Sequence, residues 1–197
     1  GTQVTSTTDS SSVTFDLTAP TLSSVSIDSD NATNEIAKEG DTVTLSFTAS
    51  ETIAAPTVAF SAGGASAAGP VTVVNTSGND WTATFTLAAG DTDGAVAFTI
   101  DFADTAGNAG TQVTSTTDSS SVTFDKTAPT LPIVSIDSDS ATNTATNEIA
   151  KVGDTVTLSF TADETIAAPT VAFWLPPRSA GGASVEGPIT VVNTSGN

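Results

Sequence analysis

Asp41–Ala49 reads DTVTLSFTA and Trp81–Leu87 reads WTATFTL, and in both stretches apolar residues alternate with threonine or serine. Side chains of a β-strand point to opposite faces in turn, so a period of two predicts strands with one buried face. The alternation returns in Ala95–Ala103 (AVAFTIDFA), and no stretch has the period of a helix. We therefore expect an all-β fold whose core is built from the apolar faces of the strands.

Turn-forming clusters of Gly, Asn, Asp and Ser separate about seven such strands between residues 17 and 125. The expected strands are Thr21–Ile27, Asp41–Ala49, Thr57–Ser61, Pro70–Asn75, Trp81–Leu87, Ala95–Ala103 and Thr111–Asp125. About seven strands in roughly 100 residues is the pattern of an immunoglobulin-like β-sandwich.

The sequence repeats at the spacing of one such sandwich. Gly1–Asp16 (GTQVTSTTDSSSVTFD) is identical to Gly110–Asp125, an offset of 109 residues, and Asp41–Ala49 returns as Asp154–Ala162. A period of this length is too long for a solenoid and suits a whole domain. We interpret the chain as a window on a linear array of modules. Residues 1–16 are the C-terminal strand of one module, 17–125 are a complete module, and 126–197 are the N-terminal part of a following module.

Composition excludes several classes of function. The chain has 4 basic and 22 acidic residues, a net charge of −18, which disfavours nucleic acid and anionic membranes and attracts cations. It has no Cys and no His, so disulfides, thiolate chemistry and the commonest general base are absent. No apolar run approaches the ~20 residues of a membrane span, so we expect no direct membrane insertion. We also expect no enzymatic activity.

Acidic residues gather where the path of such a sandwich brings loops together. Residues 50–56 and 104–109 are expected beside the incoming linker, and oxygen-rich clusters of this kind bind Ca²⁺. The candidate ligands are Asp16, Glu51, Asp101, Asp104 and Asn108, with Asp125, Asp163 and Glu164 at the equivalent positions of the following module. A bound cation would relieve the repulsion among the carboxylates and tie the linker to the domain; the alternative is a set of solvated turn residues.

A second, weaker set of candidates lies at the opposite end of the sandwich. Asp28 with Asp30, and Asp91 with Asp93, form D-x-D patterns similar to calcium loops. They lack the spacing of an EF-hand, so ordinary turns are the default interpretation.

The insertion Trp174–Arg178 (WLPPR) interrupts the repeat. It is either a tolerated surface loop or a contact made by Trp174 and Arg178, for example with another chain of a fibre.

Several short motifs occur together at domain spacing. They are the linkers Asp16–Pro20 (DLTAP) and Asp125–Pro129 (DKTAP), the pairs Ser50-Glu51 and Asp163-Glu164, and Asp104–Asn108 (DTAGN). They resemble the signatures of bacterial immunoglobulin-like repeats in large secreted surface adhesins. The resemblance implies an extracellular location at the bacterial cell surface. It also implies a spacer role that holds a distal binding domain away from the cell, with Ca²⁺ stiffening the junctions between neighbouring copies.

Two other functions stay open. The chain could be the building block of an extracellular filament whose chains associate by strand complementation or lateral packing, although Gly1–Asp16 supplies a single strand. Direct binding of ice or glycan ranks last, because the threonine faces are the ordinary outer faces of strands.

Overall fold

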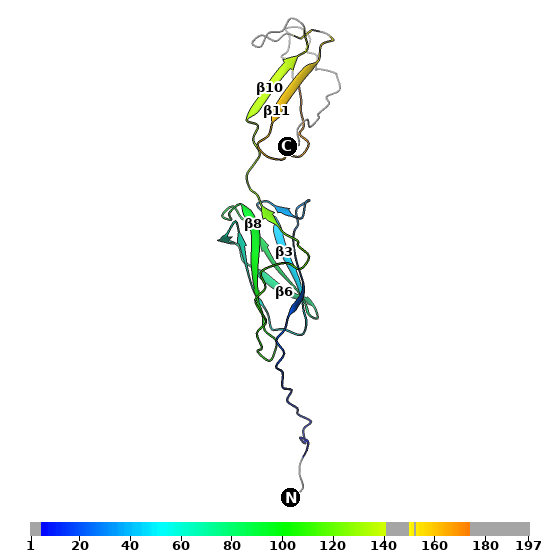
Figure 1. Ribbon diagram of the computed structural model, residues 1–197, viewed down its shortest axis with the longest axis vertical. Coiled ribbons are helices and arrows are strands. Elements are labelled where there is room, and N and C mark those ends of the chain that lie inside the picture. The colour runs from blue at the N-terminus through cyan, green and yellow to red at the C-terminus, as the bar shows by residue number, and fades with distance from the viewer. Residues whose placement is uncertain (1–4, 141–149, 152, 174–197) are drawn as a thin grey trace. The chain divides into compact units, whose positions relative to one another are not determined.

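The computed structural model describes residues 5–140, 150–151 and 153–173. Strands and irregular segments make up all of this part of the chain, so the all-β prediction is confirmed (Figure 1). The chain divides into two compact units, Gly1–Thr127 and Ala128–Asn197, which are described separately. No helix long and apolar enough to cross a membrane occurs in the described residues. Trp174 and Arg178 lie outside them, so the predicted contact of this insertion stays a prediction.

The first unit contains two sheets. One has the order β1-β3-β7-β6, with antiparallel neighbours: β1 (Leu22–Ser29), β3 (Thr42–Ala49), β7 (Asp80–Thr86) and β6 (Thr72–Ser77). The other has the order β2-β9-β8-β4-β5: β2 (Ile36–Ala37), β9 (Thr123–Phe124), β8 (Gly94–Asp101), β4 (Thr57–Ala62) and β5 (Ala65–Ser66). In this second sheet β2 and β9 run parallel, and all other neighbours are antiparallel.

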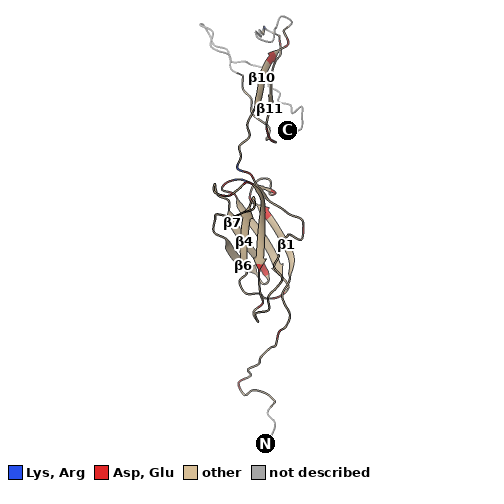
Figure 2. Cartoon of the chain, turned by 60° about the vertical axis from the view of Figure 1, so that its left-hand side comes forward, with Lys and Arg blue, Asp and Glu red and all other residues tan. Residues whose placement is uncertain are grey.

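The apolar faces of the two sheets form one core, as in a β-sandwich. Val43, Leu45 and Phe47 of β3 are buried, while the Thr and Ser residues between them are half-exposed. The ring of Phe60 in β4 stacks on that of Phe85 in β7 at 4.5 Å between centroids, so the core spans both sheets. Charged residues stay out of it: the strands in Figure 2 are almost entirely tan, and Asp and Glu lie in loops and near strand ends.

The last strand differs from the prediction of a continuous strand over Thr111–Asp125. Pairing with β8 is confined to two places: Val113 forms an isolated bridge to Ile100, and the two-residue β9 pairs with the start of β8, where the carbonyl of Val122 also accepts a hydrogen bond from the backbone N of Val96 (2.9 Å). Between them the chain crosses to the other sheet. There Thr117 Oγ1 accepts a hydrogen bond from the backbone N of Val25 (2.9 Å), and Ser120 Oγ accepts one from that of Ile27 (2.8 Å). Side-chain oxygens thus satisfy the outer edge of β1, which would otherwise offer unpaired amides to another chain.

The described part of the second unit contains one sheet of two antiparallel strands, β10 (Ile133–Ser138) and β11 (Val156–Thr161). Its register repeats that of β1 and β3. Val134 pairs with Phe160 and Ile136 with Leu158, as Val25 pairs with Phe47 and Ile27 with Leu45. The repeated sequence therefore forms the same hairpin pairing in both units.

Candidate metal centre

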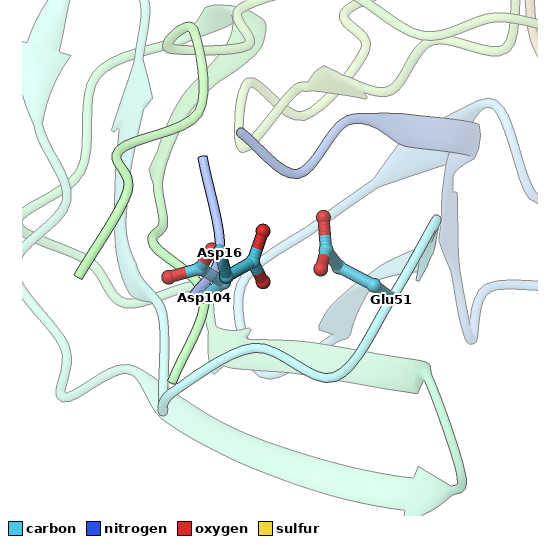
Figure 3. Close-up of side chains that lie close together, drawn as sticks. All are labelled: Asp16, Glu51 and Asp104. Atoms are coloured by element: carbon cyan, nitrogen blue, oxygen red, sulfur yellow. The ribbon is translucent and has the colours of Figure 1, made fainter. Parts of the chain in front are cut away.

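Three predicted residues come together at one end of the first unit: Asp16, Glu51 and Asp104, here called the acidic triad. Each offers one carboxylate oxygen, and these oxygens lie within 4.8 Å of one another. Asp16 comes from the linker before β1, Glu51 from the loop after β3, and Asp104 from the loop after β8. Figure 3 shows Asp16 and Asp104 side by side, with the Glu51 carboxylate facing them from the opposite side. Within the part of the chain that the structure describes, no other group of three such side chains meets this distance.

The turn after β8 holds Asp104 in place. Its Oδ1 accepts hydrogen bonds from the backbone nitrogens of Gly107 (2.7 Å) and Asn108 (2.8 Å), and its Oδ2 accepts one from Asn108 Nδ2 (2.7 Å). Gly107 has a φ of 97°, which a residue without a Cβ adopts without strain. The DTAGN motif thus encodes a tight turn around a buried carboxylate.

The loop that carries Glu51 is tied to this turn through the backbone. Ile53 forms an isolated bridge with Asp104, and the backbone N of Ala54 donates to the carbonyl of Ala103 at 2.9 Å. Ile53 is itself part of the core. The position of Glu51 two residues earlier in the chain is therefore restricted by the packing of the sandwich.

The linker is attached to the same end of the sandwich by hydrogen bonds. Asn108 Nδ2 donates to the main-chain oxygen of Asp16 (3.2 Å), and the backbone N of Thr21 donates to Ser50 Oγ (3.0 Å). The amide nitrogen of Asn108 therefore holds both the linker and Asp104, while the predicted role of its side-chain oxygen as a ligand stays a prediction. Asp16 Oδ1 accepts from the backbone N of Thr18 at 2.9 Å.

The surroundings shift the pKa values of two carboxylates of the acidic triad in opposite directions. Burial and the negative charges of Asp16 and Asp104 raise the pKa of Glu51. Burial also acts to raise the pKa of Asp104, but the hydrogen bonds from Asn108 and from the backbone of Gly107 outweigh it and lower that pKa. Asp104 thus stays ionised while Glu51 bears the repulsion, which a cation would relieve. Carboxylate oxygens from three segments suit a hard cation such as Ca²⁺.

Glu51→Gln is expected to raise the melting temperature of the cation-free chain at neutral pH. A raised pKa means that the folded state holds the proton more tightly, so this contribution to stability is complete below the ordinary pKa of 4.5 and is lost as the pH rises through the raised pKa. The variant should therefore melt at a higher temperature than wild type above pH 4.5, and the two melting temperatures should converge below that pH. Thermal unfolding in excess chelator across this range measures the effect, with the exposed Glu39→Gln as the matched control. Equal melting of Glu51→Gln and wild type at neutral pH would contradict the repulsion.

The remaining predicted ligands lie elsewhere. Asp101 ends β8, is exposed, and accepts a hydrogen bond from Gln112 Nε2 at 2.9 Å, outside the acidic triad. Asp125 belongs to the first unit and accepts from the backbone N of Thr127 at 2.9 Å. Asp163 and Glu164 belong to the second unit, where Asp163 accepts from the backbone N and Oγ1 of Thr130 (2.8 and 2.6 Å). A second cation site made by these three residues stays a prediction.

Two residues of the D-x-D patterns, Asp30 and Asp91, accept hydrogen bonds from backbone nitrogens of the first unit. Asp91 is 2% exposed, and its two carboxylate oxygens accept hydrogen bonds from the backbone nitrogens of Ala68 (2.7 Å) and Ala88 (2.8 Å). Asp30 accepts from the backbone N of Thr42 at 2.8 Å. Asp28 is an exposed residue of β1. The hydrogen bonds to Asp30 and Asp91 agree with the default interpretation of these patterns as turns.

Sequence reasoning missed a polar clamp at the end where the chain leaves the first unit. Lys126 Nζ donates to the carbonyl oxygens of Ala89 (3.1 Å) and Asp91 (2.7 Å). Asp93 accepts hydrogen bonds from the backbone N of Lys126 (3.0 Å) and from Thr127 Oγ1 (2.9 Å). The signal was present in the linkers: DKTAP has Lys126 where DLTAP has Leu17.

No family model, no curated protein and no solved structure matches this chain.

Proposed function

We propose that the chain consists of extender modules of a large extracellular adhesin at the bacterial cell surface, arranged in tandem and stiffened by Ca²⁺. The strand orders support an immunoglobulin-like assignment. When these strands are lettered A to G by their order along the chain, the first sheet β1-β3-β7-β6 contains strands A, B, E and D, as in that fold. The second sheet contains strands C (β4), F (β8) and G (β9). The repeat of sequence and of hairpin register supports the tandem arrangement.

The observation that carries the proposal is where the chain enters and leaves the first unit. It enters at Asp16, beside Asp104 in the loop after the C-terminal end of β8. It leaves after Phe124, which pairs with Gly94, the first residue of β8. An eight-residue strand at ~3.3 Å per residue separates the two points by about 25 Å. A domain with its two ends at opposite poles adds its own length to an array, which is the requirement for a spacer.

The position of the acidic triad suggests how such a spacer would be stiffened. Its carboxylates come from the linker and from two loops of the sandwich, so one cation bound to all three would fix the linker to the domain. At the opposite pole, Lys126 and Asp93 already hold the outgoing linker without a metal. Sites of this kind in extracellular modules bind Ca²⁺ with dissociation constants of about 10⁻⁴–10⁻³ M, which suits a calcium-rich exterior.

Calcium is expected to stabilise the full chain by about 2.7 kcal/mol at a concentration about 100 times the dissociation constant. Titration calorimetry and thermal unfolding, with calcium and with excess chelator, measure this directly. Glu51→Gln removes one ligand and should weaken binding about tenfold or more, while Glu39→Gln should bind as the wild type does. In chelator Glu51→Gln melts above wild type, so calcium should reverse their order. If wild type and Glu51→Gln respond equally to calcium, the acidic triad is not the binding site.

A further inference from the structure

The two sheets of the first unit have four edge strands, β1, β6, β2 and β5, and three of them are protected against pairing with another chain. β2 and β5 have two residues each, and a strand this short is a poor template for a further strand. The outer edge of β1 is bound by Thr117 and Ser120, whose side-chain oxygens accept hydrogen bonds from its amides. In the described part of the chain, β6 is therefore the edge strand of this unit that is both long and open.

The hydrogen bonds of β6 lie on one side of the strand. It pairs antiparallel with β7, and Asn75 Nδ2 closes the same hairpin by donating to the carbonyl of Gly78 at 2.9 Å. Among the residues that the structure describes, no backbone hydrogen bond joins the outer edge of β6 to another segment. The register is irregular between Asn75 and Ser77, so residues 72–75 form the regular part of the strand. Their outer N–H and C=O groups can bind a strand of another molecule.

The distribution of charge singles out the same edge. The chain has 22 acidic residues, but no charged residue lies between Glu51 and Asp80, the stretch that contains β4, β5 and β6. Residues 72–75 and their partners 81–84 in β7 are all uncharged. Copies with a net charge of −18 repel each other, and charged side chains on an edge strand normally keep it from pairing. At β6 two copies can approach without bringing the carboxylates of these strands together.

We propose that β6 pairs antiparallel with β6 of a second copy, about a two-fold axis at Val74, so that the four-stranded sheets of the two copies become continuous. The partner is a second copy because an uncharged edge strand rich in β-branched residues complements itself. The two Val74 side chains, each 48% exposed in the single chain, would cover one another, and Val73 would face Asn75. A basic partner would find no carboxylate on β6 to bind. The proposal is independent of the extender role and of calcium.

Sedimentation equilibrium of the full chain over roughly 10–500 μM tests the proposal, because an edge contact of this size is expected to be weak. Excess chelator excludes calcium, and salt at roughly 0.3 M screens the net repulsion. We expect a monomer–dimer equilibrium that Val74→Lys weakens about tenfold or more, because two lysines would replace two valines at the axis. Ile36→Lys is the matched control, since Ile36 is also 48% exposed but lies in the two-residue β2. Thermal unfolding of both variants checks that the fold is intact.

Cross-linking locates the contact. The chain has no cysteine, so Val74→Cys introduces a single thiol. Facing residues of an antiparallel pair have Cβ atoms about 4.5–5.5 Å apart, close to the spacing of a disulfide, so Val74→Cys should oxidise to a covalent dimer about tenfold faster than Ile36→Cys.

Four results would each overturn the proposal. They are a chain that stays monomeric over the whole range, association that Val74→Lys and Ile36→Lys weaken equally, and equal oxidation of the two cysteine variants. The fourth is association that is weakened by Val192→Lys alone, in the repeated segment ITVVNTS at 189–195. Because the dimer is measured in chelator, its absence would leave the calcium site of the proposed function untouched.

Discussion

Phe124→Ala is expected to lower the free energy of unfolding of the first unit by about 3–5 kcal/mol, whereas Phe15→Ala changes it by less than about 0.5 kcal/mol. The two residues sit in identical stretches of sixteen residues, so local sequence cannot account for a difference. The ring of Phe124 lies in the core beside β2 and β8, and its removal leaves a cavity. The ring of Phe15 is exposed, so its removal takes away no packing from the isolated chain.

Urea unfolding provides the measurement. The chain has two tryptophans, so a Trp174→Phe background leaves Trp81, which packs partly against the core, as the fluorescent reporter of the first unit. Unfolding free energies within about 0.5 kcal/mol for the two alanine variants would contradict the assignment of residues 123–124 to the sandwich.

Asp91→Ala is expected to cost about 2–4 kcal/mol, an unusual loss for an acidic residue in a loop. The side chain is almost wholly buried and accepts hydrogen bonds from the backbone nitrogens of Ala68 and Ala88. Truncation leaves both donors without this partner, and the cost of an unsatisfied donor exceeds the net value of the bond itself. The loop also supplies the carbonyl oxygen that Lys126 Nζ binds, so its displacement would loosen the outgoing linker.

Two companion variants make this prediction specific. Asp28→Ala removes an exposed acid of β1 and should alter the unfolding free energy by less than about 0.5 kcal/mol. Asp91→Asn keeps one acceptor oxygen but turns an amide toward the second backbone donor, so it should fall between Asp91→Ala and wild type. Calcium should stabilise both Asp91 variants by as much as it stabilises wild type, because the acidic triad is intact in them. A smaller stabilisation of Asp91→Ala by calcium would instead indicate that Asp91 is a metal ligand.

Alternation in the sequence was sufficient to predict the core. In β3 and β8 of the first unit apolar residues recur at every second position, as in Val43, Leu45 and Phe47, and the structure buries them. The short strands β2 and β5 were not predicted, because a strand of two residues is too short to show an alternating pattern. The path of residues 114–121 was not predicted for a different reason. There, Thr117 and Ser120 complete β1 with side-chain oxygens, which a pattern of hydrophobicity does not reveal.

The candidate site was predicted in its main members. Asp16, Glu51 and Asp104 follow from the path of the strands, because that path brings their three segments to one pole. The roles of Asp101 and Asn108 could not be read in the same way. Both lie close to Asp104 in the sequence, but hydrogen-bond geometry directs Asp101 to Gln112 and makes Asn108 a donor.

The bonds between the first and last segments of the first unit determine how it would respond to tension. Residues 117–120 run parallel to β1, and β9 runs parallel to β2. The backbone N of Thr123 donates to the carbonyl of Glu35, and that of Asp125 donates to the carbonyl of Ala37, both at 2.9 Å. Pulling on the two ends of the unit draws these parallel segments past each other, so their hydrogen bonds are sheared together and not unzipped one at a time. We expect a sandwich joined in this way to need a high force for rupture along its length, because several hydrogen bonds must break at the same time.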